Sequence, residues 1–193
     1  SRPQGLGHAV SLARSFINNE PFIIALGDSI IHSEETQPLL ERMITAYKSH
    51  PNSLILGTRE VPIEDVSKYG IVQPRNSNYK GEVMEIADVI EKPSPRITPS
   101  NLAFAARYIV SSSIFDALER TSPGKGGEIQ LTDAISLLLK EGTKGYSVKL
   151  TENEKRYDIG NMNSYFEAFV DFALADEKYG YQLRQYLYKK LEL

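Results

Sequence analysis

The stretch Phe22-Ile23-Ile24-Ala25-Leu26-Gly27-Asp28 decides the fold class. Its apolar residues follow Pro21 without polar alternation, which is typical of a central strand buried on both faces of a sheet. A helix is predicted over residues 38–49, and a second apolar run follows at residues 53–57. A strand, a helix and a strand in this order favour parallel pairing with a right-handed crossover. The first third of the chain therefore predicts an α/β fold.

The rest of the chain predicts a mixed sheet with further helices. Apolar residues recur at helical spacing over residues 9–17, which predicts a helix before the first strand. Beyond Arg59 the predicted strands are 69–74, 82–91, 102–110 and 146–150, and the predicted helices are 112–120, 129–140, 162–175 and 182–191. Because there is no repeat or linker, we expect one domain over residues 1–193, with 161–193 as carboxy-terminal helices.

Composition excludes several classes of protein. The 193 residues are 41% hydrophobic and 24% charged, which is typical of a globular domain rather than a disordered chain. A net charge of -3 gives no general reason to bind nucleic acid or an anionic membrane. The longest apolar runs, such as residues 22–26 and 135–139, fall far short of the roughly 20 residues that cross a bilayer.

Two further compositional features concern the compartment and the ends of the chain. Cysteine is absent, which excludes disulfides, thiolate zinc sites and a cysteine nucleophile, so we expect a cytoplasmic protein. The amino end, Ser1-Arg2-Pro3-Gln4-Gly5, has neither an initiator methionine nor the apolar stretch of a signal peptide. We therefore expect the chain to be a cut or processed form.

Two aspartates are candidate metal ligands. Asp28 follows the first strand, and Asp158 lies in Arg156-Tyr157-Asp158-Ile159-Gly160, just before a predicted helix. Ligands of open α/β sheets gather outside the carboxyl ends of the strands, and magnesium takes only one or two protein carboxylates besides substrate phosphates. From position alone, Asp28 also fits a turn residue and Asp158 a helix cap.

Glu91-Lys92-Pro93 closes a predicted strand and offers a carboxylate beside an ammonium group. The proline predicts an extended conformation at Lys92, which would point Glu91 and Lys92 to opposite faces. They could serve one ligand only if the backbone twists or bulges there. The alternative is an exposed strand end with two solvated charges.

Two glycine-rich segments and the histidines give weaker signals. Residues 123–128 form a glycine-rich loop ahead of a helix, a possible anion site, but they lack the P-loop pattern. Gly5-Leu6-Gly7-His8 also precedes a predicted helix. His8, His32 and His50 have no metal-ligand spacing, so we expect them to be structural or solvated.

A longer series of motifs follows a defined order along nearly the whole chain. In chain order the motifs are Gly5-Leu6-Gly7-His8-Ala9-Val10, Leu26-Gly27-Asp28, Val61-Pro62, Asp65-Val66-Ser67-Lys68-Tyr69-Gly70-Ile71-Val72, Glu91-Lys92-Pro93, Pro99-Ser100-Asn101-Leu102-Ala103, Arg107-Tyr108, Gly126-Gly127-Glu128-Ile129-Gln130-Leu131-Thr132-Asp133-Ala134-Ile135 and Arg156-Tyr157-Asp158-Ile159-Gly160. Together they resemble the bacterial UTP:glucose-1-phosphate uridylyltransferases, the UDP-glucose pyrophosphorylases among the sugar nucleotidyltransferases. The resemblance implies a Rossmann-like nucleotidyltransferase fold, a mixed sheet flanked by helices, here truncated at the amino-terminal side.

The resemblance also implies the reaction. A phosphate oxygen of glucose 1-phosphate attacks the α-phosphorus of UTP, giving UDP-glucose and pyrophosphate. Because the nucleophile is already an anion, no general base is needed, and catalysis rests on alignment and on charge neutralisation by Mg²⁺ and a lysine. Association with another copy of the chain, a homo-oligomer, or with the missing amino-terminal segment is also expected, because loss of inner strands would expose an edge or an apolar face.

The resemblance assigns roles to individual residues of this chain. Asp28 and Asp158 would be the Mg²⁺ ligands, with Asp28 and Lys92 the catalytic pair and Lys92 on the sugar phosphate. Glu91 and the backbone at Gly70 would hold the glucose hydroxyls. The remaining assignments are Gly5 against the uracil and Tyr69 and Tyr108 as pocket walls. The role of the Gly126–Asp133 segment, in ligand contact or in shaping the fold, is left open.

The chain departs from the family pattern in two places. The glycine-rich loop that cradles the triphosphate in family members precedes the Gly5 motif and is absent from this chain, so the chain alone is expected to be impaired in activity. The family usually has two aspartates after the glycine, where this chain has Asp28-Ser29. A thymidylyltransferase or another sugar-nucleotide pyrophosphorylase, and a non-catalytic sugar-nucleotide-binding paralogue, are the alternatives.

Overall fold

The computed structural model describes residues 4–76 and 81–191. Contacts divide the chain into two compact units. The larger unit contains the segment up to Leu26 and residues 33–154, and the smaller unit contains residues 27–32 and the segment from Lys155 on. The single domain expected over residues 1–193 stays a prediction, and its first three and last two residues lie outside the described ones.

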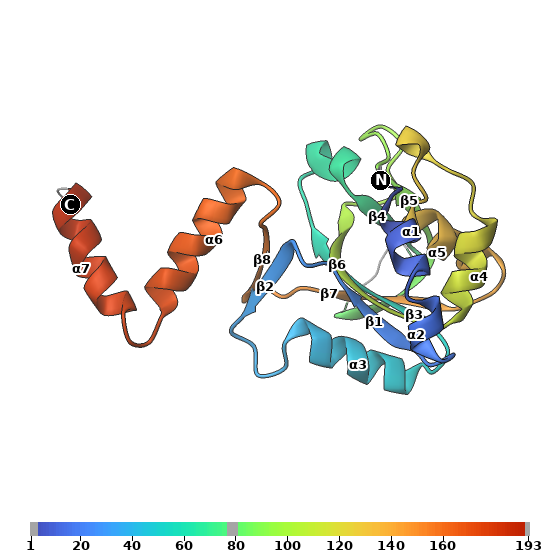
Figure 1. Ribbon diagram of the computed structural model, residues 1–193, viewed down its shortest axis with the longest axis horizontal. Helices are drawn as coiled ribbons and strands as arrows, with labels where there is room; N and C mark the ends of the chain where they lie inside the picture. The colour runs from blue at the N-terminus through green and yellow to red at the C-terminus, as the bar shows by residue number, and fades with distance from the viewer. Residues whose placement is uncertain (1–3, 77–80, 192–193) are drawn as a thin grey trace. The chain divides into compact units, whose positions relative to one another are not determined.

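The larger unit is built on a mixed sheet, which has six strands within the described residues (Figure 1). Its elements are α1 (Leu6–Ser11), α2 (Arg14–Ile17), β1 (Phe22–Ala25), α3 (Leu39–Ser49), β3 (Leu54–Glu60), the 3-10 helix η1 (Ile63–Lys68), β4 (Gly70–Pro74), β5 (Val83–Glu91), β6 (Leu102–Val110), α4 (Ser113–Arg120), the 3-10 helix η2 (Lys125–Gly127), α5 (Leu131–Lys140) and β7 (Gly145–Lys149). The strand order is β1-β6-β3-β7-β5-β4. β3 and β7 are parallel, and the other neighbours pair antiparallel. The predicted mixed α/β sheet flanked by helices is confirmed.

The first strand occupies a different place from the one its composition predicts. β1 lies at one end of the sheet order and pairs antiparallel with β6, Phe22 opposite Val110. Exposure alternates along it, and Ile23 is 42% exposed, so the expectation of a central strand buried on both faces is wrong for the described sheet. β6 lies between β1 and β3, which therefore share a direction without pairing. An apolar run indicates potential for burial but does not specify neighbours.

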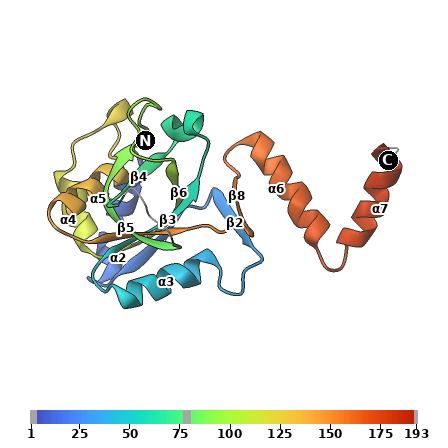
Figure 2. The same cartoon turned by 180° about the vertical axis from the view of Figure 1, so that it is seen from behind.

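Helices cover both faces of this sheet. Leu54 and Leu56 of β3 pack with Phe115 of α4 and Ile135 of α5 in one hydrophobic core. Successive side chains of a strand point to opposite faces, so Gly57 belongs to the other side. A Cβ there would lie 3.1 Å from Leu39 and 3.2 Å from Met43, both on α3. Figures 1 and 2 show α3 apart from α4 and α5, across the sheet.

Helix predictions from periodicity agree with the structure, apart from small shifts at the ends. The helix expected over residues 38–49 is α3, and those over 112–120, 129–140 and 182–191 are α4, α5 and α7 (Gly180–Leu191). The run predicted at 9–17 is divided into α1 and α2, and Asn18, with φ 47°, ends it. None of the helices in the described part of the chain is long and apolar enough to span a membrane.

The smaller unit contains two short strands that sequence periodicity did not predict. β2 (Ser29–Ser33) and β8 (Glu154–Asp158) form a two-stranded sheet, followed by α6 (Met162–Ala175) and α7. Lys155 Nζ and Tyr157 Oη of β8 lie 2.8 and 2.6 Å from Asp171 Oδ2 on α6. These two hydrogen bonds hold the pKa of Asp171 below its usual value and fasten β8 to α6.

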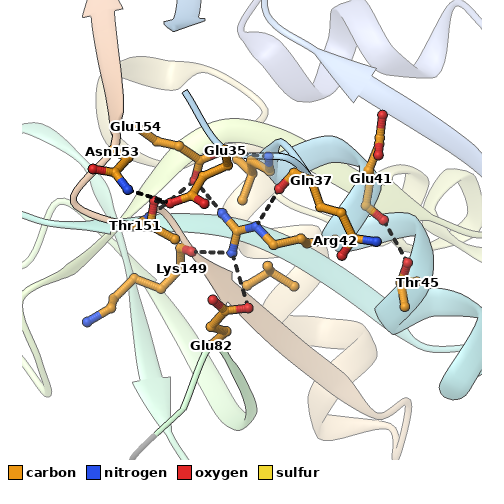
Figure 3. A network of polar contacts seen from close by, with 12 residues as sticks. Glu35, Gln37, Glu41, Arg42, Thr45, Glu82, Lys149, Thr151, Asn153 and Glu154 are labelled. Atoms are coloured by element: carbon orange, nitrogen blue, oxygen red, sulfur yellow. Dashed lines mark hydrogen bonds and ion pairs between the residues drawn. The ribbon is translucent and has the colours of Figure 1, made fainter. Parts of the chain in front are cut away.

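A buried polar network fixes the two strand ends that belong to the larger unit (Figure 3). Arg42 of α3 forms an ion pair with Glu154, whose side chain is fully buried. The same guanidinium donates to the carbonyls of Gln37 at 3.1 Å and Lys149 at 2.9 Å. Ser33 Oγ donates to Glu154 Oε1 at 3.1 Å. The ends of β2 and β8 are thereby bonded to each other and to α3.

Candidate functional site

Asp28 and Asp158 converge in the smaller unit. Asp28 directly precedes β2, Asp158 ends β8, and the amide of Ile159 donates to the Asp28 carbonyl at 2.8 Å. A Cβ on Gly160 would lie 3.4 Å from Asp158 Oδ1 and 3.5 Å from Asp28 Oδ2. Two carboxylates from distant parts of the chain therefore flank one small space that is kept open by a glycine.

This pair suits a hard divalent cation. Carboxylate oxygens are the ligands that Mg²⁺ prefers, and Mg²⁺ commonly keeps only one or two protein carboxylates, with water or phosphate oxygens in its other positions. Asp28 is exposed and Asp158 partly so, which leaves room for such ligands. Within the residues described, no group of three or more acidic, histidine or cysteine side chains could hold a metal ion. The other ligands of such an ion would therefore be water or phosphate oxygens.

The alternative interpretation of Asp158 as a helix cap is wrong. The side chain of Asn161 caps α6, accepting from the amide of Asn163 at 2.9 Å. The backbone amide of Asp158 donates to Ser164 Oγ at 3.1 Å, which holds the end of β8 against the first turn of α6. The Asp158 carboxylate is thus not used in capping.

Arg156 lies beside this carboxylate pair. Its side chain is 7% exposed, its Nε donates to Ser29 Oγ at 2.7 Å, and its Nη2 lies 3.4 Å from Asp158 Oδ2. Sequence reasoning did not assign a role to Arg156 or Ser29. The sequence spacing indicates the position of Arg156. It lies two residues before Asp158, and residues two apart on a strand share one face of the sheet.

In the larger unit, Gly70 and Glu91 are direct partners across β4 and β5. Thr132 of α5, which is buried, donates to Glu91 Oε2 at 2.6 Å, and Lys92 Nζ lies 3.6 Å from Glu91 Oε1. A Cβ on Gly70 would lie 2.6 Å from the Phe104 ring and 3.1 Å from Thr132 Oγ1. The structure thus brings together the residues predicted to hold the sugar and its phosphate.

The backbone at Lys92 differs from the expectation. Lys92 has φ 46°, so the extended conformation predicted from the following proline is wrong. Its amide donates to the Tyr69 carbonyl at 3.0 Å, which holds the left-handed turn in place. The twist brings the Lys92 ammonium to the Glu91 carboxylate, although an extended chain would point them to opposite faces. Such strained backbone is concentrated at functional sites in proteins.

The Gly126–Asp133 segment contacts both the loop around Gly5 and the side chain of Glu91. Gly5 has φ 97°, and a Cβ there would lie 2.6 Å from the Ile129 carbonyl oxygen. The Gly7 amide donates to that carbonyl, and the Ile129 amide donates to the Gln4 carbonyl, both at 2.9 Å. Three residues further on, Thr132 holds Glu91. Thr132 was missed because its partner is distant in sequence.

Glu91 also borders a surface hollow of about 470 Å³. Other residues lining it are Asp88, Gln130, Asp133, Ser136 and Lys140. Burial raises the pKa of Asp133, and the negative charge of Glu91 raises it further. Ser136 Oγ donates to Asp88 Oδ1 at 2.6 Å. The hollow therefore has an acidic wall that is only partly neutralised by Lys140.

Tyr69, Tyr108 and two of the histidines pack against other side chains. Tyr108 is 4% exposed and makes an edge contact with Phe104 in the core. Tyr69 packs against a small apolar cluster, with the Arg59 guanidinium 5.1 Å from its ring centre. His50 stacks on Tyr146, and His32 makes an edge contact with Phe172. The pocket-wall roles of Tyr69 and Tyr108 stay predictions.

Comparison with known proteins shows the family of the chain. A family model described as "Nucleotidyl transferase" matches residues 1–174. The UTP–glucose-1-phosphate uridylyltransferase of Streptococcus pyogenes is 38% identical over 192 residues, which are 98% of this chain and 61% of that protein. The chain therefore spans less than two thirds of the length of the curated relatives that it matches.

Solved structures give the same result. A UDP-glucose pyrophosphorylase complexed with UDP-glucose superposes with a TM-score of 0.79 at 37% identity, covering 86% of this chain and 61% of that one. A UTP-bound enzyme from Acinetobacter baumannii gives a TM-score of 0.84 at 32% identity, covering 96% of this chain and 62% of that one. These matches confirm the resemblance read from the motifs, and the chain belongs to the nucleotidyl transferase family.

Proposed function

We propose that this chain is the metal- and sugar-binding part of a uridylyltransferase that converts UTP and glucose 1-phosphate to UDP-glucose and pyrophosphate. The observation that carries the proposal is the convergence of Asp28 and Asp158 on the space at Gly160. The uridylyltransferase of Streptococcus pyogenes and the pyrophosphorylase structures bound to UTP and UDP-glucose support the choice of nucleotide and sugar.

Asp28 and Asp158 would hold the divalent metal that nucleotidyl transferases generally use, and Mg²⁺ is the proposed ion. When bound, Mg²⁺ neutralises charge on phosphate oxygens. Because Asp28 is exposed and Asp158 is partly exposed, coordination positions of the ion stay accessible to phosphate oxygens. An ion held by so few protein ligands is expected to bind much more strongly with nucleotide than without it.

Glu91 and Lys92 divide the recognition of the sugar phosphate. The exposed Lys92 ammonium suits the phosphate, and Glu91 suits sugar hydroxyls because a carboxylate accepts hydrogen bonds. Thr132 occupies one lone pair of Glu91 Oε2 and fixes the carboxylate orientation. The phosphate oxygen that Lys92 aligns would attack the α-phosphorus, and pyrophosphate would leave, without a general base.

A pyrophosphate-release assay tests the reaction. The purified chain is incubated with glucose 1-phosphate and Mg²⁺, with UTP or dTTP, beside an Asp28→Asn variant. We expect release with UTP that exceeds release with dTTP and disappears in Asp28→Asn. Equal release with the two nucleotides would contradict the uridylyl assignment, and an unaffected Asp28→Asn would contradict the metal site.

A binding measurement separates recognition from turnover, since the chain spans 61% of its relative from Streptococcus pyogenes. Isothermal titration with UDP-glucose and Mg²⁺ is expected to show binding that weakens in Asp28→Asn and Lys92→Ala. A control, Lys48→Ala, changes a lysine in the last turn of α3 and should leave binding unchanged. Absence of UDP-glucose binding by the unmodified chain would overturn the proposal.

Association between copies of the chain is part of the proposal. Leu12 and Phe16 are 70% and 83% exposed, and the adjoining edge strand exposes 42% of Ile23. Unpaired strand edges and exposed apolar side chains promote association. Analytical ultracentrifugation should show dimers or larger species that decrease on dilution, and a monomer at every concentration would contradict this expectation.

A further inference from the structure

Arg156 is buried beside the carboxylate pair with its hydrogen-bonding capacity incompletely used. β8 places it two residues before Asp158, and its side chain is 7% exposed. Its Nε donates to Ser29 Oγ at 2.7 Å and its Nη2 to Asp158 Oδ2 at 3.4 Å. Its Nη1 is buried and has no hydrogen-bond partner among the described residues.

The two oxygens of Asp158 face different groups. Oδ2 is the oxygen that Arg156 contacts, whereas Oδ1 is the oxygen nearest the space at Gly160, which Asp28 Oδ2 borders from its other side. A carboxylate held at one oxygen keeps its second oxygen in a defined direction. A planar guanidinium achieves this better than an ammonium group, because its N–H groups point in fixed directions.

We propose that Arg156, anchored by Ser29, is the positioning residue of the metal site: it holds Oδ2 of Asp158 so that Oδ1 faces the cation shared with Asp28. This inference rests on the proposed function of the carboxylate pair. Two contacts support it, because Nε on Ser29 Oγ and Nη2 on Asp158 Oδ2 together fix the plane of the guanidinium.

Ser29 determines the position of the guanidinium in this chain. The residue is only 3% exposed. Its hydroxyl oxygen accepts from Arg156 Nε at 2.7 Å, a shorter distance than the 3.4 Å between Arg156 Nη2 and Asp158 Oδ2. Removing that hydroxyl changes no charge and leaves the carboxylates intact. Ser29→Ala therefore separates positioning from electrostatics, which a neutral replacement of Arg156 would not do.

Direct binding of Mn²⁺, a substitute for Mg²⁺, tests the proposal. The electron paramagnetic resonance signal of free Mn²⁺ is measured, with UDP-glucose present, during titration of the unmodified chain and of Ser29→Ala, Arg156→Lys, Lys155→Arg and Asp28→Asn. Partners that orient metal ligands typically contribute about 10–100-fold to metal affinity. We expect Ser29→Ala and Arg156→Lys to bind Mn²⁺ about tenfold more weakly. Lys155→Arg is the matched control, because Lys155 pairs with Asp171 instead.

Circular dichroism establishes that each variant is folded. The binding results then distinguish failure of the metal site from failure of the positioning role of Arg156. If Asp28→Asn binds Mn²⁺ as the unmodified chain does, the metal site and the proposed function both fail. If Asp28→Asn loses binding but folded Ser29→Ala stays within twofold of the unmodified chain, only the positioning role of Arg156 is overturned. Should Arg156→Lys not fold, Ser29→Ala decides the question alone.

Discussion

Replacing Glu154 by glutamine should destabilise the larger unit strongly. The Glu154 side chain is 0% exposed and forms an ion pair with Arg42. It also accepts hydrogen bonds from the amides of Leu39 at 2.7 Å and Thr151 at 3.1 Å and from Ser33 Oγ at 3.1 Å. Figure 3 shows Arg42 and Thr151 beside Glu154. All of its oxygens are engaged as acceptors, so no arrangement of a carboxamide reproduces the set.

The size of the effect follows from burial. Glutamine keeps the shape but removes the charge, and its NH₂ group would face a donor. Removing one partner of a buried ion pair costs about 3–5 kcal/mol, because the remaining charge stays buried. Arg42 would keep only the longer ion pair with the exposed Glu82, at 3.8 Å. At roughly 2–4 °C per kcal/mol for a chain of this size, the melting temperature should fall by about 6–20 °C.

Urea unfolding followed by circular dichroism at pH 7 measures this loss, and differential scanning calorimetry measures the shift in melting temperature. Glu141→Gln is the matched control. Glu141 pairs with Arg120, but the two side chains are 41% and 51% exposed. An exposed pair contributes about 0–1 kcal/mol. A Glu154→Gln variant within about 1 kcal/mol of the unmodified chain would refute the view that this network anchors the strand ends.

Three further predictions concern the site. Gly160→Ala should weaken Mn²⁺ binding, because its methyl group would take up part of the space beside the two carboxylate oxygens, at 3.4 and 3.5 Å, whereas Gly27→Ala, in open space, should not. Asp133→Asn should raise the melting temperature at pH 8, because it removes a partly buried negative charge. This gain should shrink as the pH falls through the raised pKa of Asp133, because protonation of the aspartate then removes that charge in the unmodified chain as well. A gain in melting temperature that is independent of pH would contradict this prediction. Lys92→Gly should stabilise the fold by about 0.5–1 kcal/mol through relief of the positive φ, yet weaken glucose 1-phosphate binding in calorimetry. Unchanged binding would remove Lys92 from the site.

The helices were predictable because their burial has a local signature. The apolar residues of α3, Leu39, Met43 and Ala46, are buried on one face and recur at helical spacing. The strands β2 and β8 lack such a signature. Glu154-Lys155-Arg156-Tyr157-Asp158 is almost entirely polar, and its pairing partner is distant in sequence. Periodicity cannot reveal a strand whose stability comes from one remote neighbour and from ion pairs.

The candidate site was predictable by residue type but not by geometry. The glycine, carboxylate and lysine motifs identified Gly70, Glu91 and Lys92, and the structure brings them together. The rule for residues before proline failed at Lys92, because a long-range hydrogen bond to the Tyr69 carbonyl holds the backbone in the left-handed region. Local preferences near proline amount to a bias, which tertiary contacts can override.

The Gly126–Asp133 segment makes contacts that shape the fold, and a role in ligand contact stays a prediction. Its Ile129 peptide group bonds on both sides to the loop around Gly5, and the start of α5 presents Thr132 to Glu91. Gly5 and Glu91 are predicted to contact opposite ends of a nucleotide sugar. Because four residues of backbone join the two contacts, a displacement at Ile129 would move both ends of the ligand site together. We therefore expect the segment to set the spacing between the two predicted contacts, with Thr132 fixed in place by its hydrogen bond to Glu91.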